Sequence, residues 1–496
     1  MTTVEDAARV APLAVVNAPS VVSDAGSAPD RPVDWSAVRA IRHDVSAALT
    51  DQLGQRPGLS LGSQRELARD LVTKHVSERT RRAVRDGNGA PSTVEEDALV
   101  AAVLDSIFGL GRMQALVNDT QIENIDVTGS DPAWLEYADG RIVAGPRVAD
   151  TDDELVETLQ NFATYLGQTS RSFSTAHPTL RLTLPDGSRL TAIMEVTPRP
   201  EVHIRRHRHV AVALDDLAGL GDLGGRHPCA GTLDECLLAF LRAAMAARLN
   251  IVVTGTVNVG KTTLIRALAN EIDPLERVVT IEKEYELLLH TLPERHARVV
   301  AMEAREGNAE SGVGEAGAGA VNQAALLEIA LRMNPRRIIV GEVLGDEGVP
   351  MLRALASGTS GSLCTIHARG AKVVFDRIAE LGLCAKERIP VEASYLLAAN
   401  GIDLVVHVAM IDERAIGGRL HRFVAHVLEV TGIGEGGRPA TNELFSPGPD
   451  GRAVPSAYGP SDRLLAALER AGFDRAYLSR PAGMWTAPLP TRAGVR

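Results

Sequence analysis

Several features that define other protein classes are scarce in this sequence. Its 496 residues include only four cysteines, Cys229, Cys236, Cys364 and Cys384, without close paired spacing or a histidine at zinc-finger distance. This pattern is typical of reduced thiols and favours neither a disulfide framework nor a zinc site. Aromatic residues make up 3%, so the core must be mainly aliphatic, which suits buried parallel strands covered by helices.

Long apolar runs and an excess of positive charge are also missing. No segment approaches the roughly 20 apolar residues that cross a bilayer. The start of the chain is acidic where a signal peptide would be basic. We therefore expect a cytoplasmic protein that can work at the cytoplasmic face of a membrane. The formal net charge of −11 argues against a protein that coats DNA or RNA.

The pattern of apolar residues changes along the chain and indicates five regions. Residues 1–35 lack periodicity and predict a disordered leader, whereas 36–100 have the apolar spacing of a helical extension. Residues 101–220 mix both patterns and predict a smaller α+β domain. Between 230 and 435, helices alternate with apolar strands, as in an α/β domain with a parallel sheet. Residues 436–496 are rich in Gly and Pro and predict an irregular tail with one helical stretch.

Turn and cap residues refine this division. Ser92 precedes an acidic first turn and predicts a helix N-cap. Asp139-Gly140 and Asp186-Gly187 are each typical of a β-hairpin turn. A Gly/Ala-rich stretch at 307–322 predicts a mobile loop inside the α/β region.

The strongest motif is a phosphate-binding loop directly after the apolar segment NIVVT. Its residues are Gly255, Thr256, Val257, Asn258, Val259, Gly260, Lys261 and Thr262. The glycines let the backbone curl so that successive N–H groups face phosphate oxygens, and the following helix adds its positive dipole end. We expect Lys261 to reach the β- and γ-phosphates, Thr262 to hold Mg²⁺ and Thr263 to lie by the α-phosphate. The motif predicts a nucleotide triphosphatase that uses Mg²⁺.

Acidic residues follow two of the apolar strands. Glu342 ends RRIIVGE, and strand C-termini of a parallel sheet face a bound nucleotide. It is therefore a candidate to hold Mg²⁺ through water and to orient the attacking water, with a solvated strand-end carboxylate as the alternative. Glu282 ends VVTIE and Glu286 follows it, and either could act as the general base or polarise the attacking water. His367 ends SLCTIH and is either a structural hydrogen-bonding group or a sensor of the γ-phosphate.

The segment HIRRHRH, residues 203–209, concentrates positive charge in an acidic chain. Three interpretations stay open. It is a solvated edge strand, a phosphate contact across a domain or subunit boundary, or a nucleic-acid contact.

Taken together, the motifs resemble the type II/type IV secretion superfamily ATPases, most closely the CpaF-type ATPases of tight-adherence pilus systems. The resemblance runs from about residue 104 to 432. Four family boxes occur in the expected order, namely the Walker A loop 255–262, the acidic box 281–287, the Walker B segment 337–342 with 345–347, and the His box 358–368. The segment LPDGSRLTA and the later VHIRR are similar to the family's N-terminal domain.

The resemblance implies a RecA-like P-loop NTPase core with a parallel sheet, preceded by a smaller α+β, PAS-like domain. It implies a homo-hexamer in which ATP lies between the two domains and hydrolysis drives an inner-membrane platform for pilus assembly or protein secretion. Membrane association would come through that partner, and no nucleic acid is expected. Arginines of the N-terminal domain reach the phosphates in such enzymes. Their counterparts by position are Arg189 and Arg205, with Arg206 as a further candidate.

Four residues depart from the family pattern. Lys283 stands where the acidic box usually has Asp, Leu344 replaces an Arg after the Walker B segment, Ser360 replaces a His or Asp, and Asn258 lies where the loop is often glycine. These departures keep a nucleotide-binding regulatory or structural subunit with weak hydrolysis open as an alternative to a motor. A DNA-translocating RecA-like motor is a third hypothesis, disfavoured by the negative net charge.

Overall fold

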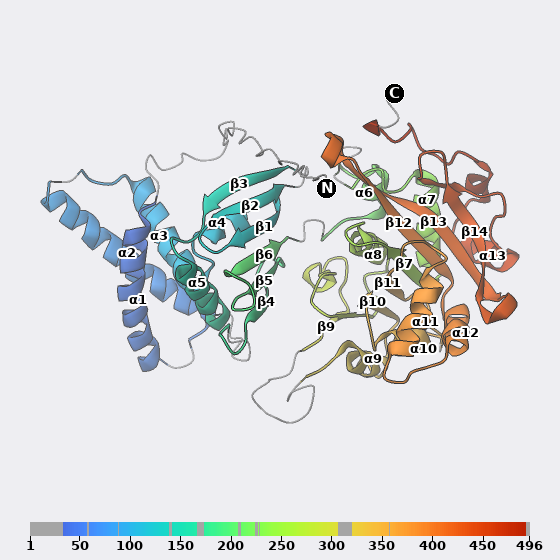
Figure 1. The fold of residues 1–496 in the computed structure, drawn as a ribbon, viewed down its shortest axis with the longest axis horizontal. Coiled ribbons are helices and arrows are strands. Elements are labelled where there is room, and N and C mark those ends of the chain that lie inside the picture. The colour runs from blue at the N-terminus through green and yellow to red at the C-terminus, as the bar shows by residue number, and fades with distance from the viewer. Residues whose placement is uncertain are drawn as a thin grey trace, which may run out of the picture. The chain divides into compact units, whose positions relative to one another are not determined.

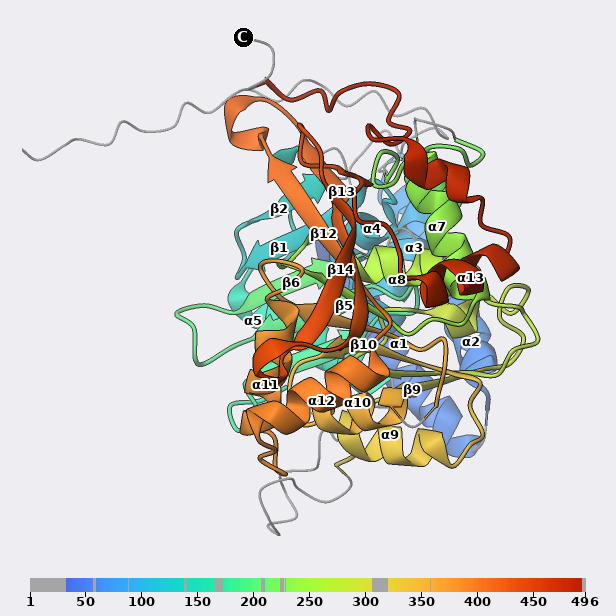
Figure 2. The same ribbon diagram turned by 90° about the vertical axis from the view of Figure 1, so that its right-hand side faces the viewer.

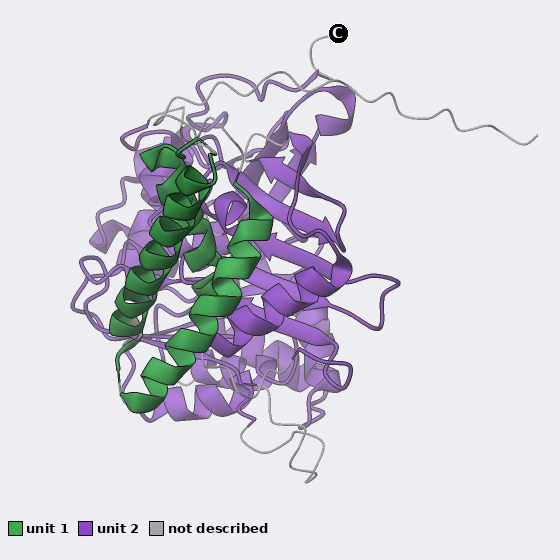
Figure 3. Ribbon diagram, turned by 90° about the vertical axis from the view of Figure 1, so that its left-hand side faces the viewer, with its two compact units in different colours: residues 1–112 green, residues 113–496 purple. Residues whose placement is uncertain are grey.

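The computed structural model describes residues 33–56, 59–87, 89–137, 141–165, 173–206, 210–223, 227, 229–305, 320–356 and 358–492. They belong to two compact units, 1–112 and 113–496 (Figure 3). Most of the predicted leader, the Asp139-Gly140 turn, residues 207–209 of the basic segment and most of the predicted loop 307–322 lie outside the described ranges. None of the helices within these ranges is both long enough and apolar enough to cross a bilayer.

The described residues of the first unit form three helices, α1 (Trp35–Gln55), α2 (Leu61–Arg85) and α3 (Thr93–Phe108). Their apolar stripes meet in a small core that includes Val38, Ile41, Val45, Val72, Val76, Ala102 and Val103. The Ser92 hydroxyl accepts the backbone N–H of Glu95, and the Glu95 carboxylate accepts the N–H of Ser92. This reciprocal pair satisfies two donors at the start of α3 and confirms the N-cap predicted at Ser92.

The second unit begins with α4 (Met113–Asn118) and a six-stranded antiparallel sheet. Its strands run in the spatial order β3-β2-β1-β6-β5-β4. Their bounds are β1 (Ile122–Thr128), β2 (Pro132–Tyr137), β3 (Ile142–Arg147), β4 (Thr179–Thr183), β5 (Arg189–Ile193) and β6 (Glu201–Arg205), with α5 (Asp152–Tyr165) between β3 and β4. The predicted hairpin turn at Asp186-Gly187 is confirmed, because β4 pairs with β5 and Gly187 has a φ of 83°.

The larger part of this unit is built on a nine-stranded sheet in the order β15-β14-β13-β12-β7-β11-β10-β8-β9. The six strands from β12 to β9 are parallel, and β13, β14 and β15 add antiparallel neighbours at one edge. Their bounds are β7 (Ile251–Gly255), β8 (Val278–Glu282), β9 (Val299–Glu303), β10 (Arg337–Val343), β11 (Leu363–His367), β12 (Leu404–Asp412), β13 (Leu420–Ile433), β14 (Pro439–Pro447) and β15 (Ala453–Pro455).

Helices cover both faces of this sheet (Figures 1 and 2). One face carries α6 (Leu214–Ala218), α7 (Glu235–Ala246), α8 (Lys261–Ala269) and α13 (Asp462–Arg470), and the other carries α9 (Gln323–Leu331), α10 (Gly348–Ala356), α11 (Val374–Cys384) and α12 (Val391–Gly401). Within β7, Ile251 and Val253 enter the first core and Val252 enters the second. Alternate side chains are therefore buried on opposite faces, which confirms the predicted α/β class.

The C-terminal segment differs from the irregular tail predicted from residue 436. It contributes β14 and β15 to the sheet, and α13 packs Leu464 and Leu468 into the first core. The Phe240 ring of α7 lies 5.2 Å from Phe445 and 5.7 Å from Phe473, both in edge-on geometry. The Gly and Pro residues of this segment are widely spaced and fall mainly in its turns. A few aromatic side chains bury the segment against α7, which its composition alone does not indicate.

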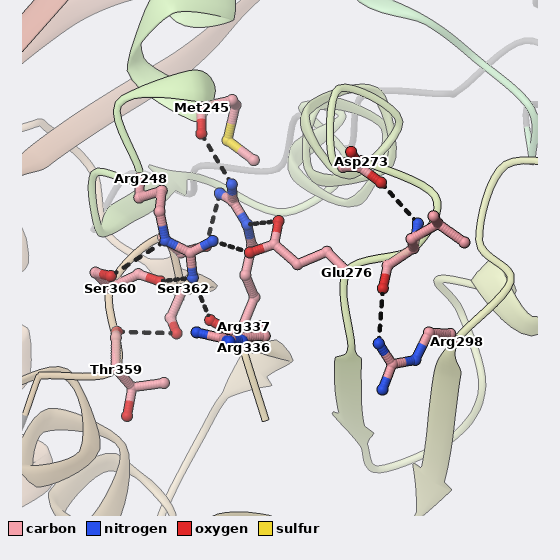
Figure 4. A network of polar contacts seen from close by, with 12 residues as sticks. Met245, Arg248, Asp273, Glu276, Arg298, Arg336, Arg337, Thr359, Ser360 and Ser362 are labelled. Carbon is pink, nitrogen blue, oxygen red and sulfur yellow. Dashed lines mark hydrogen bonds and ion pairs between the residues drawn. The ribbon is translucent and has the colours of Figure 1, made fainter. Parts of the chain in front are cut away.

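A buried polar network ties together the starts of the parallel strands (Figure 4). Arg337, at the start of β10, is 4% exposed and donates to Glu276 at 2.9 Å and to the Met245 carbonyl at 3.0 Å. Glu276 also pairs with Arg248, whose Nε donates to the Ser360 hydroxyl at 3.3 Å. A buried cation requires such partners, because desolvation without them is costly. The network therefore stabilises the end of the sheet where the parallel strands begin, which is opposite the end that carries the phosphate-binding loop.

Candidate active site

The phosphate-binding loop lies at the C-terminal end of β7, between β11 and β12. Gly255 is required there, because a Cβ on it would lie 2.5 Å from the carbonyl oxygen of Val408. Val259 is 1% exposed and anchors the loop in the core, whereas Val257 is exposed. Gly260 has a φ of 94° and is the N-cap of α8, so the helix begins at Lys261 as predicted.

Lys261 is held at the centre of the site. It is 7% exposed, and its Nζ donates to the Thr256 carbonyl at 2.8 Å and lies 3.1 Å from His367 Nδ1. Burial lowers the pKa of the Lys261 ammonium to about 8, against the opposing charges of Glu342 and Glu286. A desolvated ammonium beside open backbone N–H groups is suited to bind a triphosphate.

His367 connects the loop lysine to the end of β10. Its Nδ1 faces Lys261, and its Nε2 pairs with the Glu342 carboxylate. Because the ammonium can only donate, Nδ1 accepts and Nε2 carries the proton toward Glu342. The structure thus brings three predicted residues from three different boxes into one chain of contacts.

The acidic box turns back toward α8. Glu286 Oε2 accepts the Thr262 hydroxyl at 3.0 Å, and Arg266 of α8 donates to the Glu286 carbonyl at 3.0 Å. Glu282 is 2% exposed, and its Oε2 accepts the backbone N–H groups of Glu286 and Leu287, both at 2.7 Å. Glu282 therefore shapes the turn that presents Glu286 to Thr262.

Burial raises the pKa of the Glu282 carboxyl to about 7, with the two backbone N–H groups acting in the opposite direction. Its second oxygen, Oε1, has no hydrogen-bond partner within the described part of the chain. A Cβ on Gly341 would lie 3.0 Å from Glu282 Cγ, so the glycine of the Walker B segment makes room for this carboxyl.

The two predicted arginines form a cross-strand pair, Arg189 on β5 and Arg205 on β6. Arg189 reaches the acidic box, where its Nη1 lies 2.7 Å from Glu286 Oε1 and its Nη2 donates to the Glu284 carbonyl at 2.9 Å. Arg205 makes no such contact but contributes positive charge near Lys261. Arg206 turns away toward Asp186, at 3.5 Å.

The four departures fall in different places. The Ser360 hydroxyl accepts a hydrogen bond from Arg248 in the network at the starts of the parallel strands, so Ser360 is outside the site. Lys283 and Leu344 line one cavity of ≈ 360 Å³ together with residues of β4 and the start of α9. Asn258 lies in the loop itself with a φ of 62°, a conformation that Asn adopts more readily than most residues.

Sequence reasoning did not include Arg422. This residue of β13 donates through Nε to the carbonyl of Asn258 at 2.9 Å. Its segment contains only an ordinary strand pattern, so no local signal could have identified it. The contact depends on how the β12–β13 hairpin lies against the loop.

Comparison of the sequence with models of known protein families identifies the family of this chain. A family model described as "Type II/IV secretion system protein" matches residues 110–412, which include the six-stranded sheet and the nucleotide-binding part of the larger one. The chain belongs to this family. It is an ATPase with an N-terminal domain followed by a RecA-like core, as predicted.

The chain is also similar to several individual proteins. The type IV secretion system protein VirB11 of Brucella suis is 29% identical over 341 residues, covering 65% of this chain and 90% of that protein. The type IV secretion system protein PtlH of Bordetella pertussis is 29% identical over 336 residues, covering 64% and 93%. The crystal structure of the Brucella suis VirB11 ATPase with sulphate matches at 27% identity and a TM-score of 0.32, covering 66% of this chain and 96% of that one.

Proposed function

We propose that this family ATPase is a Mg²⁺-dependent motor of the CpaF type that powers pilus assembly or protein secretion through an inner-membrane platform. The observation that carries the catalytic part is the contact of Lys261 with His367, and of His367 with Glu342, at the mouth of the phosphate-binding loop. An ammonium, an imidazole and a carboxylate thereby lie within contact of one another beside the loop, as a phosphate-cleaving site requires of its binding and water-orienting groups.

Phosphate binding falls to the loop and to Lys261. Backbone N–H groups of the curled loop and the N-terminus of α8 supply fixed positive dipoles. Lys261 exchanges the Thr256 carbonyl and His367 for phosphate oxygens, which bind it more strongly because they are charged. Thr263, in the first turn of α8, would lie by the α-phosphate of a bound nucleotide.

The donors beside Lys261 fit a magnesium ion. Mg²⁺ prefers oxygen ligands, keeps several waters and needs only one or two protein groups besides the phosphates. Thr262 supplies a hydroxyl, with the Glu286 carboxylate 3.0 Å from it and Glu342 on the neighbouring side of Lys261. A bound Mg²⁺ would neutralise charge on the β- and γ-phosphates.

Hydrolysis requires an oriented water and neutralisation of the leaving phosphate. Glu342 accepts a proton of the attacking water while His367 holds its carboxylate in place. Glu282 keeps Glu286 against Thr262 through the backbone of the acidic box. Water oxygen then bonds to the γ-phosphorus as the bond to the β-phosphate oxygen breaks, and ADP and phosphate leave.

Arg189 and Arg205 add positive charge from the N-terminal domain. Arg189 is paired with Glu286 of its own chain, so we propose that it serves the site in cis by exchanging this carboxylate for phosphate. The same exchange would draw β5 toward the nucleotide and release it after hydrolysis. Such a shift is how ATP turnover would be converted into movement.

The direct test replaces Lys261 with alanine. Each charge-assisted hydrogen bond to phosphate is worth about 1.5–3 kcal/mol, so we expect kcat/KM for ATP to fall at least about 100-fold. The matched control is Lys372→Ala, since this lysine is 65% exposed and its ammonium pairs with Glu443 at 4.0 Å, outside the contacts that join Lys261, His367 and Glu342. Unchanged ATP hydrolysis in Lys261→Ala would remove this site from the reaction.

Two further outcomes decide between the motor and its alternatives. ATP binding by calorimetry with negligible turnover, in the assembled state as well, would indicate a regulatory subunit. Stimulation of hydrolysis by DNA that declines steeply with salt would indicate a nucleic-acid motor.

A further inference from the structure

The phosphate-binding loop contains one residue whose conformation is unfavourable for its side chain. Asn258 has a φ of 62°, and it is not a glycine. For an L-residue the left-handed region costs of the order of 1 kcal/mol, although asparagine tolerates it better than most. Something outside the loop is therefore needed to hold this turn in the shape that directs its N–H groups toward phosphate.

The β12–β13 hairpin provides such a contact. β12 pairs with β7 only as far as His407, opposite Thr254, and both hairpin strands continue beyond that point (Figure 2). A bulge interrupts the β12–β13 ladder after His407, and the extended part lies against the loop, with the Val408 carbonyl close to Gly255. Bulges commonly redirect the side chains that follow them.

Arg422 projects from this extended part onto the loop. Its Nε donates to the Asn258 carbonyl at 2.9 Å, and its Cδ lies 3.6 Å from the position of a Cβ on Gly260. One side chain thus contacts Asn258 and lies over Gly260, two residues of the loop with positive φ. A guanidinium also makes a stronger hydrogen bond to a carbonyl than a neutral donor does.

The hairpin is itself held in place. Arg414 in the connection between the strands pairs with Asp412 and with Glu136 of β2, both at 2.9 Å. The positive charge of Arg422 helps to lower the pKa of Asp412, but it is Arg414 that donates hydrogen bonds to the Asp412 carboxylate. Arg422 therefore extends from a fixed strand and remains available to the loop.

We propose that Arg422 is a positioning residue for nucleotide binding, which pre-organises the phosphate-binding loop through the Asn258 carbonyl. The inference rests on the proposed role of this loop in ATP binding. Without Arg422 the loop must be ordered by the nucleotide itself, and that ordering cost reduces affinity. The chemical step is made by other residues, so its rate should change little.

The experiment measures ATP affinity and steady-state kinetics of the full chain with Arg422→Ala. Loss of one charge-assisted hydrogen bond predicts a rise of about tenfold in Kd and KM, with kcat within about twofold of the original. Arg422→Lys should recover part of the affinity, since it keeps a charged donor. Arg419→Ala, an exposed arginine just before β13, is the control and should leave both constants unchanged.

The Asn258→Gly background provides the decisive comparison. Glycine adopts positive φ without steric cost, so the loop should depend less on Arg422. We expect Arg422→Ala to raise KM by less than about threefold in this background. An equal rise in both backgrounds would overturn the proposal, as would an unchanged KM in the single variant or a fall in kcat that accounts for the whole loss.

This test is separable from that of the proposed function. If Lys261→Ala binds ATP normally, the loop is not the nucleotide site and the premise fails. If Lys261→Ala loses binding and Arg422→Ala does not, the site stands and only the role of Arg422 is wrong.

Discussion

At the scale of single residues, burial changes the chemistry of two side chains in opposite directions. It lowers the pKa of Lys261 to about 8 and raises that of Glu282 to about 7. Both shifts oppose the charged form, as desolvation always does. Both pKa values therefore lie close to neutral pH, where a small change in pH alters the charge of Lys261 and of Glu282.

A pH profile of kcat/KM should show both groups. Lys261 must be protonated to bind phosphate, so activity should fall as pH rises through about 8. Glu282 accepts two backbone N–H groups of the acidic box, and it accepts them more strongly as a carboxylate, so activity should fall as pH decreases through about 7. Since kcat/KM reports the free enzyme, a narrow bell between these values is expected from stopped assays at pH 6 to 9.5.

Glu282→Gln should remove the acidic limb of that profile while the alkaline limb persists. A profile that is flat across this range in the original protein would contradict the assignment of both groups.

At the scale of elements, the contact between β7 and the β12–β13 hairpin determines the shape of the phosphate-binding loop. Gly255 ends β7 close to the Val408 carbonyl, and a Cβ on it would lie 2.5 Å from that oxygen. The oxygen belongs to the backbone, so it cannot move aside as the end of a flexible side chain can. Close packing of two backbones is a rigid constraint, because interiors have few voids to absorb a displaced group.

Gly255→Ala should therefore displace the loop. Overpacking of this kind costs about 1–3 kcal/mol, which predicts a loss of roughly 5- to 150-fold in ATP affinity, measurable by calorimetry. Gly54→Ala in α1 is the control, since a Cβ there meets no atom within 4 Å. Normal affinity in Gly255→Ala would mean that the loop and the hairpin are less tightly coupled than their geometry implies.

The helix α13 is the second element whose contribution is measurable. Leu468 is fully buried in the core that also contains α7 and β7, whereas Leu465 on the same helix is only partly buried. Leu468→Ala should reduce the free energy of unfolding in urea by about 2–5 kcal/mol, and Leu465→Ala by clearly less. Equal, small losses would indicate that the C-terminal segment does not belong to the cooperative core.

At the scale of the whole molecule, Arg189 of the N-terminal domain contacts the acidic box of its own chain. Arg189 contacts Glu286, which lies 97 positions later in the sequence, and only the tertiary fold creates such a contact. The proposed cis role makes a prediction for mixed assemblies. Equal amounts of Arg189→Ala and Lys261→Ala subunits should show no more ATPase activity than the two variants measured separately.

Recovery of activity in the mixture would instead assign Arg189 to a neighbouring subunit's site. The same samples can be tested for the proposed hexamer by sedimentation velocity with and without ATP. A monomer under all nucleotide conditions would contradict the ring.

The sequence by itself determined the class of fold and the identity of the phosphate-binding loop, because both depend on local pattern. Alternating apolar strands and helices specify a covered parallel sheet, and the spacing of Gly255, Gly260 and Lys261 specifies one loop between a strand and a helix. The strand ends at Glu282, Glu342 and His367 could be predicted in the same way. Their roles in the reaction remain proposals.

Only the tertiary structure decided which of these residues meet. That His367 joins Lys261 to Glu342, that Glu282 shapes the turn presenting Glu286, and that Arg422 holds the loop all depend on strand order in the sheet. The tail of the chain joined the core for the same reason, since a few buried residues such as Leu468 outweigh its Gly- and Pro-rich composition. Contacts between distant segments follow from packing, which no local pattern encodes.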